Sequence, residues 1–396
     1  MMSVWSSLVG QEAAVAKLSD AAASARAIVA SRGGRASDEA RSMSHAWLIT
    51  GPPGSGRSVA ARAFAAALQC TGETPGCGAC PGCRTTMART NADVVFAATE
   101  TSIINVDTAR SLVLQAQSSP SQGLWRVIVV EDADRLGESG ANALLKAIEE
   151  PPEHTVWLLC APSPDDMIAT IRSRCRHLGL RIPTAAAVAD LLVREGVATP
   201  DVALDAARAA QSHIGLARAL ARDPQMRERR RAIITAPASV RSVGEAVMAA
   251  DRLLETAKAQ ADAQVSERNA REKAELMRQL GMDEGESATK ASRTMIRQLE
   301  EDQKRRSKRA LTDAIDRALI DLLAIYRDVL MVQVGGDGEL INTDLSDLVH
   351  EIAQDSTPRQ TLARVDHIET ARRRLIANGN PLLVLEDMAI SLRPQA

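Results

Sequence analysis

The segment 51–58 constrains the fold most, because it places a glycine-rich loop between two regular elements. Its residues are Gly51, Pro52, Pro53, Gly54, Ser55, Gly56, Arg57 and Ser58. The spacing is that of a phosphate-binding P-loop, G-x-x-x-x-G-K-[ST]. The apolar run 46–50 before it predicts a buried strand, and a helical pattern follows it. Such a loop lets backbone N–H groups converge on phosphate oxygens, so the segment is a candidate nucleotide site in which Ser58 would reach Mg²⁺.

The loop departs from the motif at Arg57, where lysine is expected. Lysine places a compact ammonium between phosphates, whereas the guanidinium is planar and forked, so the exchange is not conservative. We expect an arginine here to allow nucleotide binding at most, and not normal turnover. A plain glycine-rich turn is the alternative.

A second departure follows the apolar run 126–130, at Glu131 and Asp132. A working site has an aspartate that holds Mg²⁺ and then a carboxylate that orients the attacking water. Here the order is reversed, and Asp132 is one methylene too short for the second role. The pair therefore predicts a nucleotide-type site that has lost catalytic geometry.

The apolar runs of the first 180 residues predict a parallel sheet with helices on both faces, because they alternate with helical patterns. They span residues 46–50, 94–98, 126–130 and 156–161. After Pro183 only helical periodicity remains, at 186–195, 203–210 and 214–222. We therefore predict an α/β P-loop domain over 1–182, a small helical domain over 183–237 and a second helical domain over 238–396.

Within the last domain, the segment 256–308 is highly charged and poor in large apolar residues. It predicts a long exposed helical hairpin that turns at 281–285, or a partly disordered insert. The apolar segment 314–332 must be buried against other helices. A turn at 378–381 precedes a last helix over 382–392.

Four cysteines share one short loop that is rich in glycine and proline. They are Cys70, Cys77, Cys80 and Cys83. Four thiolates at this spacing suit a structural Zn²⁺ site with no open position; disulfides and an iron–sulfur cluster are the alternatives. Cys160 is expected to be a core residue, and Cys175 has no metal role.

Composition excludes some functions. The net charge is −2 and aromatic residues make up 2% of the chain, so neither a global basic field nor base stacking predicts direct nucleic-acid binding. The basic run 304–309 could approach phosphates, but the acidic residues 300–302 favour a solvated helix face. We see no leader peptide and no membrane-spanning run, which predicts a cytoplasmic protein with no membrane partner.

Several motifs together resemble those of bacterial AAA+ clamp-loader subunits. They are Val9-Gly10-Gln11, the loop 51–58, the run Asn142 to Pro152, Ser173-Arg174-Cys175 and, more weakly, 215–220 and Asn380-Pro381. Most of these motifs lie in the first 180 residues. The rest of the chain resembles these subunits only in its general helical character. The resemblance implies an AAA+ domain with a zinc module, a helical lid and a helical collar.

The resemblance also implies roles for single residues. Arg174 of the Ser-Arg-Cys motif would reach the ATP γ-phosphate of a neighbouring subunit as an arginine finger in trans. The sensor-1 position falls at 160–162, where no polar side chain is available. Arg218 lies at the sensor-2 position, and a plain helix-surface arginine is the alternative there.

Three departures, at Arg57, at Glu131-Asp132 and at sensor 1, favour the delta-prime type of subunit, which would lack independent ATPase activity. As a stationary subunit it would work with gamma/tau and delta subunits to load a sliding clamp onto primer–template DNA. Binding of ATP or ADP with Mg²⁺ is left open. The alternatives are an active gamma/tau-type ATPase and a zinc-dependent nucleic-acid-binding module with a vestigial P-loop.

Overall fold

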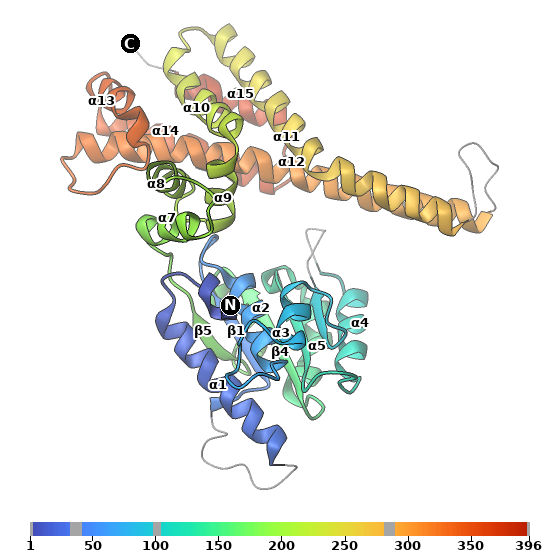
Figure 1. Ribbon diagram of the computed structural model, residues 1–396. Coiled ribbons are helices and arrows are strands. Elements are labelled where there is room, and N and C mark those ends of the chain that lie inside the picture. The colour runs from blue at the N-terminus through green and yellow to red at the C-terminus, as the bar shows by residue number, and fades with distance from the viewer. Residues whose placement is uncertain (1–2, 32–41, 98–103, 281–289, 394–396) are drawn as a thin grey trace. The chain divides into compact units, whose positions relative to one another are not determined.

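The computed structural model describes residues 3–31, 42–97, 104–280 and 290–393. The chain divides into two units, Met1–Arg222 and Asp223–Ala396 (Figure 1). The second unit begins inside the segment 183–237 that we assigned to the small helical domain. The division into three domains stays a prediction.

The first unit is built around a parallel sheet of five strands within the described residues, in the order β2-β3-β4-β1-β5. The strands are β1 (Ala46–Thr50), β2 (Val94–Ala97), β3 (Arg126–Val130), β4 (Thr155–Ala161) and β5 (Arg176–Gly179). β1 pairs with β4 on one side and with β5 on the other. Four strands confirm the apolar runs predicted from the sequence, although Ala98 lies outside the described residues.

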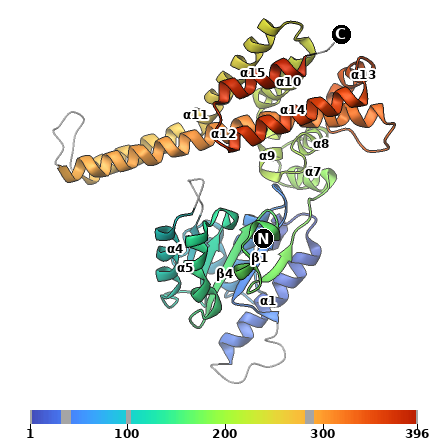
Figure 2. The same ribbon diagram turned by 180° about the vertical axis from the view of Figure 1, so that it is seen from behind.

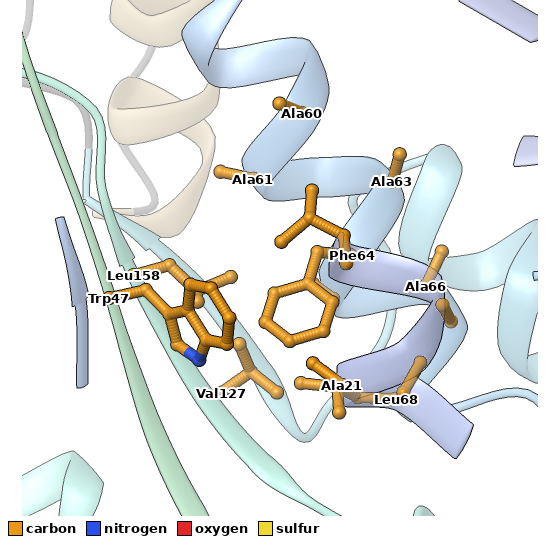
Figure 3. Packing of buried hydrophobic residues seen from close by; sticks show 14 of the residues in the cluster. Ala21, Trp47, Ala60, Ala61, Ala63, Phe64, Ala66, Leu68, Val127 and Leu158 are labelled. Atoms are coloured by element: carbon orange, nitrogen blue, oxygen red, sulfur yellow. The ribbon is translucent and has the colours of Figure 1, made fainter. Parts of the chain in front are cut away.

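Alternate residues of each strand feed two separate cores, because successive side chains of a strand point to opposite faces. Trp47 and Ile49 lie in one core, while Ala46 and Leu48 lie in the other. In the first core the Trp47 ring packs edge-on against Phe64, with ring centroids 5.3 Å apart (Figure 3). The prediction of helices on both faces is confirmed.

The helices of this unit flank the sheet and continue beyond it. One face carries α1 (Glu12–Ala30) and α2 (Arg57–Leu68), and the other carries α4 (Val106–Ala116) and α5 (Glu138–Glu149). The remaining elements are η1 (Val4–Ser7), α3 (Pro81–Met87), η3 (Ala133–Arg135), η4 (Pro164–Asp166), α6 (Ala169–Arg172), α7 (Ala185–Arg194), α8 (Pro200–Ala209) and α9 (Ile214–Arg222).

The sequence did not predict β5. Its residues Arg-His-Leu-Gly contain a single apolar side chain, Leu178, and only that side chain is buried. An edge strand needs little hydrophobicity of its own, because its backbone pairs with the neighbouring inner strand β1. β5 therefore forms because its backbone pairs with β1, and its sequence has no hydrophobic periodicity that would predict a strand.

The regular elements of the second unit are all helices within its described residues. It contains α10 (Pro224–Ser239), α11 (Val243–Gln279), α12 (Lys290–Gln333), η5 (Thr343–Leu345), α13 (Ser346–Gln354), α14 (Pro358–Ile376) and α15 (Pro381–Leu392). α11 and α12 lie side by side along much of their length (Figures 1 and 2). Their described parts make the charged segment 256–308 helical, while the turn predicted at 281–285 lies outside the described residues.

The apolar segment 314–332 lies in α12 and is buried, as predicted. Ile315, Leu319 and Leu322 are at most 1% exposed and pack with residues of α14 and α15. A buried ion pair joins Arg230 of α10 to Asp321 of α12, with Nε 3.0 Å from Oδ1. This pair fixes α10 against the core of the second unit.

A buried carboxylate organises the loop before β3 in the first unit. Asp93 accepts hydrogen bonds from the backbone N–H groups of Ser121, Gln122 and Gly123 at 2.7, 2.8 and 2.6 Å. Burial alone would raise the pKa of Asp93, but these donors outweigh burial and hold its pKa below the usual value of 3.8. The charged form therefore stabilises the fold.

We predict that Asp93→Asn lowers the free energy of unfolding by about 1–3 kcal/mol at pH 7, because three backbone donors lose a charged acceptor. The contribution of the carboxylate is present above about pH 4 and is lost as the pH falls through the lowered pKa. The difference in free energy of unfolding between the wild type and Asp93→Asn should therefore become smaller below pH 3.8. Tryptophan fluorescence during denaturation measures it, since all four tryptophans lie in the first unit. Asp107→Asn, at a side chain 86% exposed, should change little.

Candidate functional site

The loop 51–56 connects the end of β1 to the start of α2, as a phosphate-binding loop requires. Gly54 and Gly56 have φ angles of +89° and +90°, a region that favours glycine. A Cβ atom at Gly54 would lie 2.8 Å from the Cα of His213. Glycine at 54 is thus needed both for the turn and for the close approach of the segment before α9.

The loop is held from the N-terminal side by Gln11, which is 4% exposed. Its Nε2 donates to the carbonyl oxygens of Ser55 at 3.3 Å and Arg181 at 2.5 Å, and its Oε1 accepts from the Arg181 N–H at 3.1 Å. One amide therefore fixes the N-terminal motif, the loop and the segment after β5 relative to one another.

Arg57 turns back over its own loop, where Nη1 donates to the carbonyl oxygen of Gly51. Its charge also acts on the carboxyl edge of the sheet, where it opposes the rise in pKa that burial causes at Asp134. Ser58 lies in the first turn of α2, where backbone N–H groups have no helical partner. The Ser55 hydroxyl is buried without a hydrogen-bond partner among the described residues. The loop thus offers phosphate-binding groups, but its cation is already engaged.

Glu131, at the carboxyl end of β3, forms an ion pair with Arg89, with Nη2 2.6 Å from Oε1. The Arg89 guanidinium also lies over the Phe96 ring, 4.9 Å from its centroid. Sequence reasoning did not find Arg89, because it sits in a turn after α3 and reaches Glu131 only in the folded chain. A carboxylate paired in this way is a poor ligand for Mg²⁺, so the residues at the metal position do not fit that ion well.

The end of β4 supplies no polar side chain next to the loop. Cys160 lies beside Ile49 of β1 and is fully buried. Burial raises the pKa of Cys160 to about 12, so the thiol stays neutral. The backbone just after β4 contacts the loop instead: the Gly51 N–H donates a hydrogen bond to the carbonyl oxygen of Pro162 at 3.2 Å.

Arg174 lies in the turn between α6 and β5. Its Nε donates to the carboxylate of Glu149, and its Nη1 donates to the Thr170 carbonyl oxygen at 2.7 Å and to the Ser173 hydroxyl at 3.3 Å. The side chain is 39% exposed. The arginine is therefore tethered and still accessible.

Arg218 of α9 makes a two-pronged ion pair with Glu195. Its Nε and Nη2 each donate to one carboxylate oxygen at 2.9 Å. This contact is what a helix-surface arginine would make. Its assignment as sensor 2 stays a prediction.

The four-cysteine cluster spans the loop after α2 and the first turn of α3. The sulfur atoms of Cys70, Cys77, Cys80 and Cys83 all lie within 4.8 Å of one another, and all six cysteines are free thiols. Four sulfurs held tetrahedrally at about 2.3 Å from Zn²⁺ would be separated by about 3.8 Å. The Cys80 and Cys70 sulfurs are 3.8 Å apart. The donor set therefore fits a metal such as zinc.

Backbone N–H groups support the sulfurs, as they do in closed metal sites. The N–H groups of Ala79 and Cys80 each donate to the Cys77 sulfur at 3.4 Å. Burial opposes ionisation of Cys80, but N–H donors from Cys83 and Thr71 outweigh it and lower the pKa of Cys80 to about 6. The loop favours thiolate at this position.

The N-terminus packs on the cysteine loop. The Val4 N–H donates to the Gly76 carbonyl oxygen at 3.0 Å, and a Cβ atom at Gly76 would lie 2.7 Å from Nε1 of Trp5. Arg26 of α1 donates to the carbonyl oxygens of Glu73 and Cys70 at 2.8 and 2.9 Å. The cluster thus joins η1, α1 and α2 into one body.

A parallel sheet with a phosphate loop after β1, carboxylates after β3 and a helical region beyond it defines an AAA+ P-loop protein. A family model described as "DNA polymerase III, delta subunit" matches residues 35–184. The chain is 35% identical over 170 residues to DNA polymerase III subunit gamma/tau of Mycobacterium tuberculosis, covering 41% of this chain and 29% of that protein. It is 35% identical over 182 residues to subunit delta' of Escherichia coli, covering 44% and 54%.

Over this part the chain is similar to both the delta-prime and the gamma/tau subunits of DNA polymerase III. It spans about half or less of the length of these curated relatives. Among solved structures, a gamma subunit-related protein of Thermotoga maritima covers 88% of this chain and 93% of its own, at 17% identity and a TM-score of 0.44. The sequence matches alone carry the similarity to these subunits. No helix in the described part of the chain is long and apolar enough to cross a membrane.

We predict that the purified chain carries about one zinc ion per chain, measured by elemental analysis. Cys80→Ser should lower this content, because a closed site loses one of its four ligands. Cys175→Ser is the matched control and should leave it unchanged. Chelation should also shift the emission of Trp5, which packs on the cysteine loop. Metal-free protein with wild-type emission and stability would contradict the assignment.

Proposed function

We propose that the chain is a delta-prime-type subunit of a replicative clamp loader, which lends Arg174 to the ATP site of a neighbouring subunit and does not hydrolyse ATP itself. The proposal rests chiefly on one observation: the parallel sheet separates Arg174 from the phosphate loop of its own chain.

Strand direction supports this separation. Thr50, the last residue of β1, pairs with Gly179 at the end of β5, while Arg174 comes before the start of β5 at Arg176. The four residues of β5 therefore lie between them, roughly 13 Å along the strand. Arg174 sits at the amino edge of the sheet and the loop sits at the carboxyl edge. A phosphoryl group that Arg174 contacts would have to be held by another subunit.

The state of the chain's own loop supports the absence of turnover. Arg57 is bound to Gly51, and Glu131 is paired with Arg89. Hydrolysis needs a free cation between the phosphates and a carboxylate that holds Mg²⁺. We infer that a nucleotide at this loop, if bound, would stabilise the subunit and would not be hydrolysed.

The partners follow from the proposed role. Gamma/tau and delta subunits would assemble with the chain, and the sliding clamp and primer–template DNA would be contacted through the complex. Zinc would be structural, since four sulfurs leave no open coordination position.

An active gamma/tau-type ATPase is the second candidate. The identity of 35% to gamma/tau of Mycobacterium tuberculosis, equal to that with delta' of Escherichia coli, favours it. The engaged Arg57 and Glu131 favour delta-prime. The two candidates differ in where the arginine acts and in whether the isolated chain turns over ATP.

We predict that Arg174→Ala lowers the kcat of clamp- and DNA-stimulated ATP hydrolysis by the reconstituted complex about 100-fold or more, because an arginine finger in trans stabilises transition-state charge. Size-exclusion chromatography should show that the complex still assembles. Arg172→Ala is a matched control: it removes an exposed arginine two residues away, which pairs with Asp165 at 2.5 Å. Wild-type hydrolysis by the assembled Arg174→Ala complex would rule out the proposed role.

A further inference from the structure

Two carboxylates end α5, at a position where a helix disfavours negative charge. Glu149 is the last residue of the helix, and Glu150 is its C-cap. The partial negative charge of a helix C-terminus makes a carboxylate there unfavourable by about 0.3–1 kcal/mol. Only Glu149 is compensated within the described residues, by Arg174. Glu149 and Glu150 thus both experience the negative end of the helix dipole, but only Glu149 contacts the candidate arginine finger.

The contacts of Arg174 leave part of its guanidinium available. Nε and Nη1 bind Glu149, Thr170 and Ser173. Nη2 has no hydrogen-bond acceptor among residues 3–31, 42–97, 104–280 and 290–393. An arginine has five N–H donors, so the two on Nη2 can still reach a ligand. The Arg174 side chain is thus held through Nε and Nη1, while Nη2 remains available to a ligand.

The element that carries Glu149 is rigid. Leu144 and Ile148 of α5 are fully buried in one core of the sheet, and Ile171 of α6 packs in the same core. A free arginine side chain has about 2 kcal/mol of rotamer entropy, and much of it is lost when the guanidinium must meet a phosphate in one geometry. A hydrogen bond that Arg174 donates to a carboxylate on a helix packed in the core reduces that loss before the neighbour binds.

We propose that Glu149 is a positioning residue for Arg174: its carboxylate fixes the guanidinium so that Nη2 is presented to the phosphoryl group bound by the neighbouring subunit. This inference rests on the proposed function. The positioning depends on the hydrogen bond to Nε. The negative charge itself weakens the field that Arg174 exerts on a phosphate. Glutamine, which keeps the acceptor oxygen and removes the charge, should therefore preserve the positioning.

The test measures steady-state ATP hydrolysis by the reconstituted complex with clamp and primed DNA. We expect Glu149→Ala to lower kcat about two- to fivefold, the range of an exposed ion pair, with the KM for ATP unchanged. Glu149→Gln should restore wild-type kcat or exceed it. Glu150→Ala, which removes the adjacent carboxylate, should behave as wild type.

A double variant separates positioning from other roles. Because Glu149 acts through Arg174, Glu149→Ala combined with Arg174→Ala should be no slower than Arg174→Ala alone. A further loss in the double variant would overturn the inference, and so would wild-type kcat in Glu149→Ala.

Either result would leave the proposed function standing, because Arg174→Ala alone and ATP turnover by the isolated chain test that function separately. Thermal unfolding followed by tryptophan fluorescence checks that Glu149→Ala is folded. If Glu149→Ala is unfolded, Glu149→Gln decides instead: a folded complex with this variant and a kcat below that of the wild type would overturn the inference.

Discussion

β1 pairs with a parallel strand on each side, and these two ladders determine where the loop 51–56 and Arg174 lie. Parallel ladders to β4 and β5 align the carboxyl ends of the strands at one edge, where the phosphate loop begins. The same ladders place the turn with Arg174 at the opposite edge. On the proposed function, a chain with this topology would bind a phosphate at one edge of the sheet and offer a cation to another molecule at the opposite edge.

Contacts at the carboxyl edge of the sheet support the proposal that the chain keeps the fold of an ATPase without its activity. The cation of the loop, Arg57, and the carboxylate after β3, Glu131, are both satisfied by partners within the chain. To contact a nucleotide or Mg²⁺, Arg57 would have to break its hydrogen bond to Gly51, and Glu131 would have to break its ion pair with Arg89. Breaking these contacts costs free energy. The glycines and Gln11 still hold the loop in shape, because the same contacts support the sheet and the segment that leads to the helices beyond it.

The sequence predicted the elements that carry strong local signals. The apolar strands, the P-loop, the cysteine cluster and the buried segment 314–332 follow from periodicity, glycine spacing and thiol spacing. It failed where tertiary contacts decide. β5 has one buried side chain, and Arg89 reaches Glu131 from a turn 42 residues away. The role of Arg174 is a prediction from resemblance, and its contact with Glu149 could not be foreseen, since it depends on how α5 and α6 pack in one core.

We propose that the chain keeps the fold of a phosphate-binding ATPase but lacks the groups that cleave ATP. ATP turnover by the purified chain alone tests it most directly, with Ser58→Ala measured in parallel to expose contaminating activity. We predict that both proteins hydrolyse ATP at the same background rate. Steady turnover by the wild-type chain that Ser58→Ala abolishes would contradict the claim.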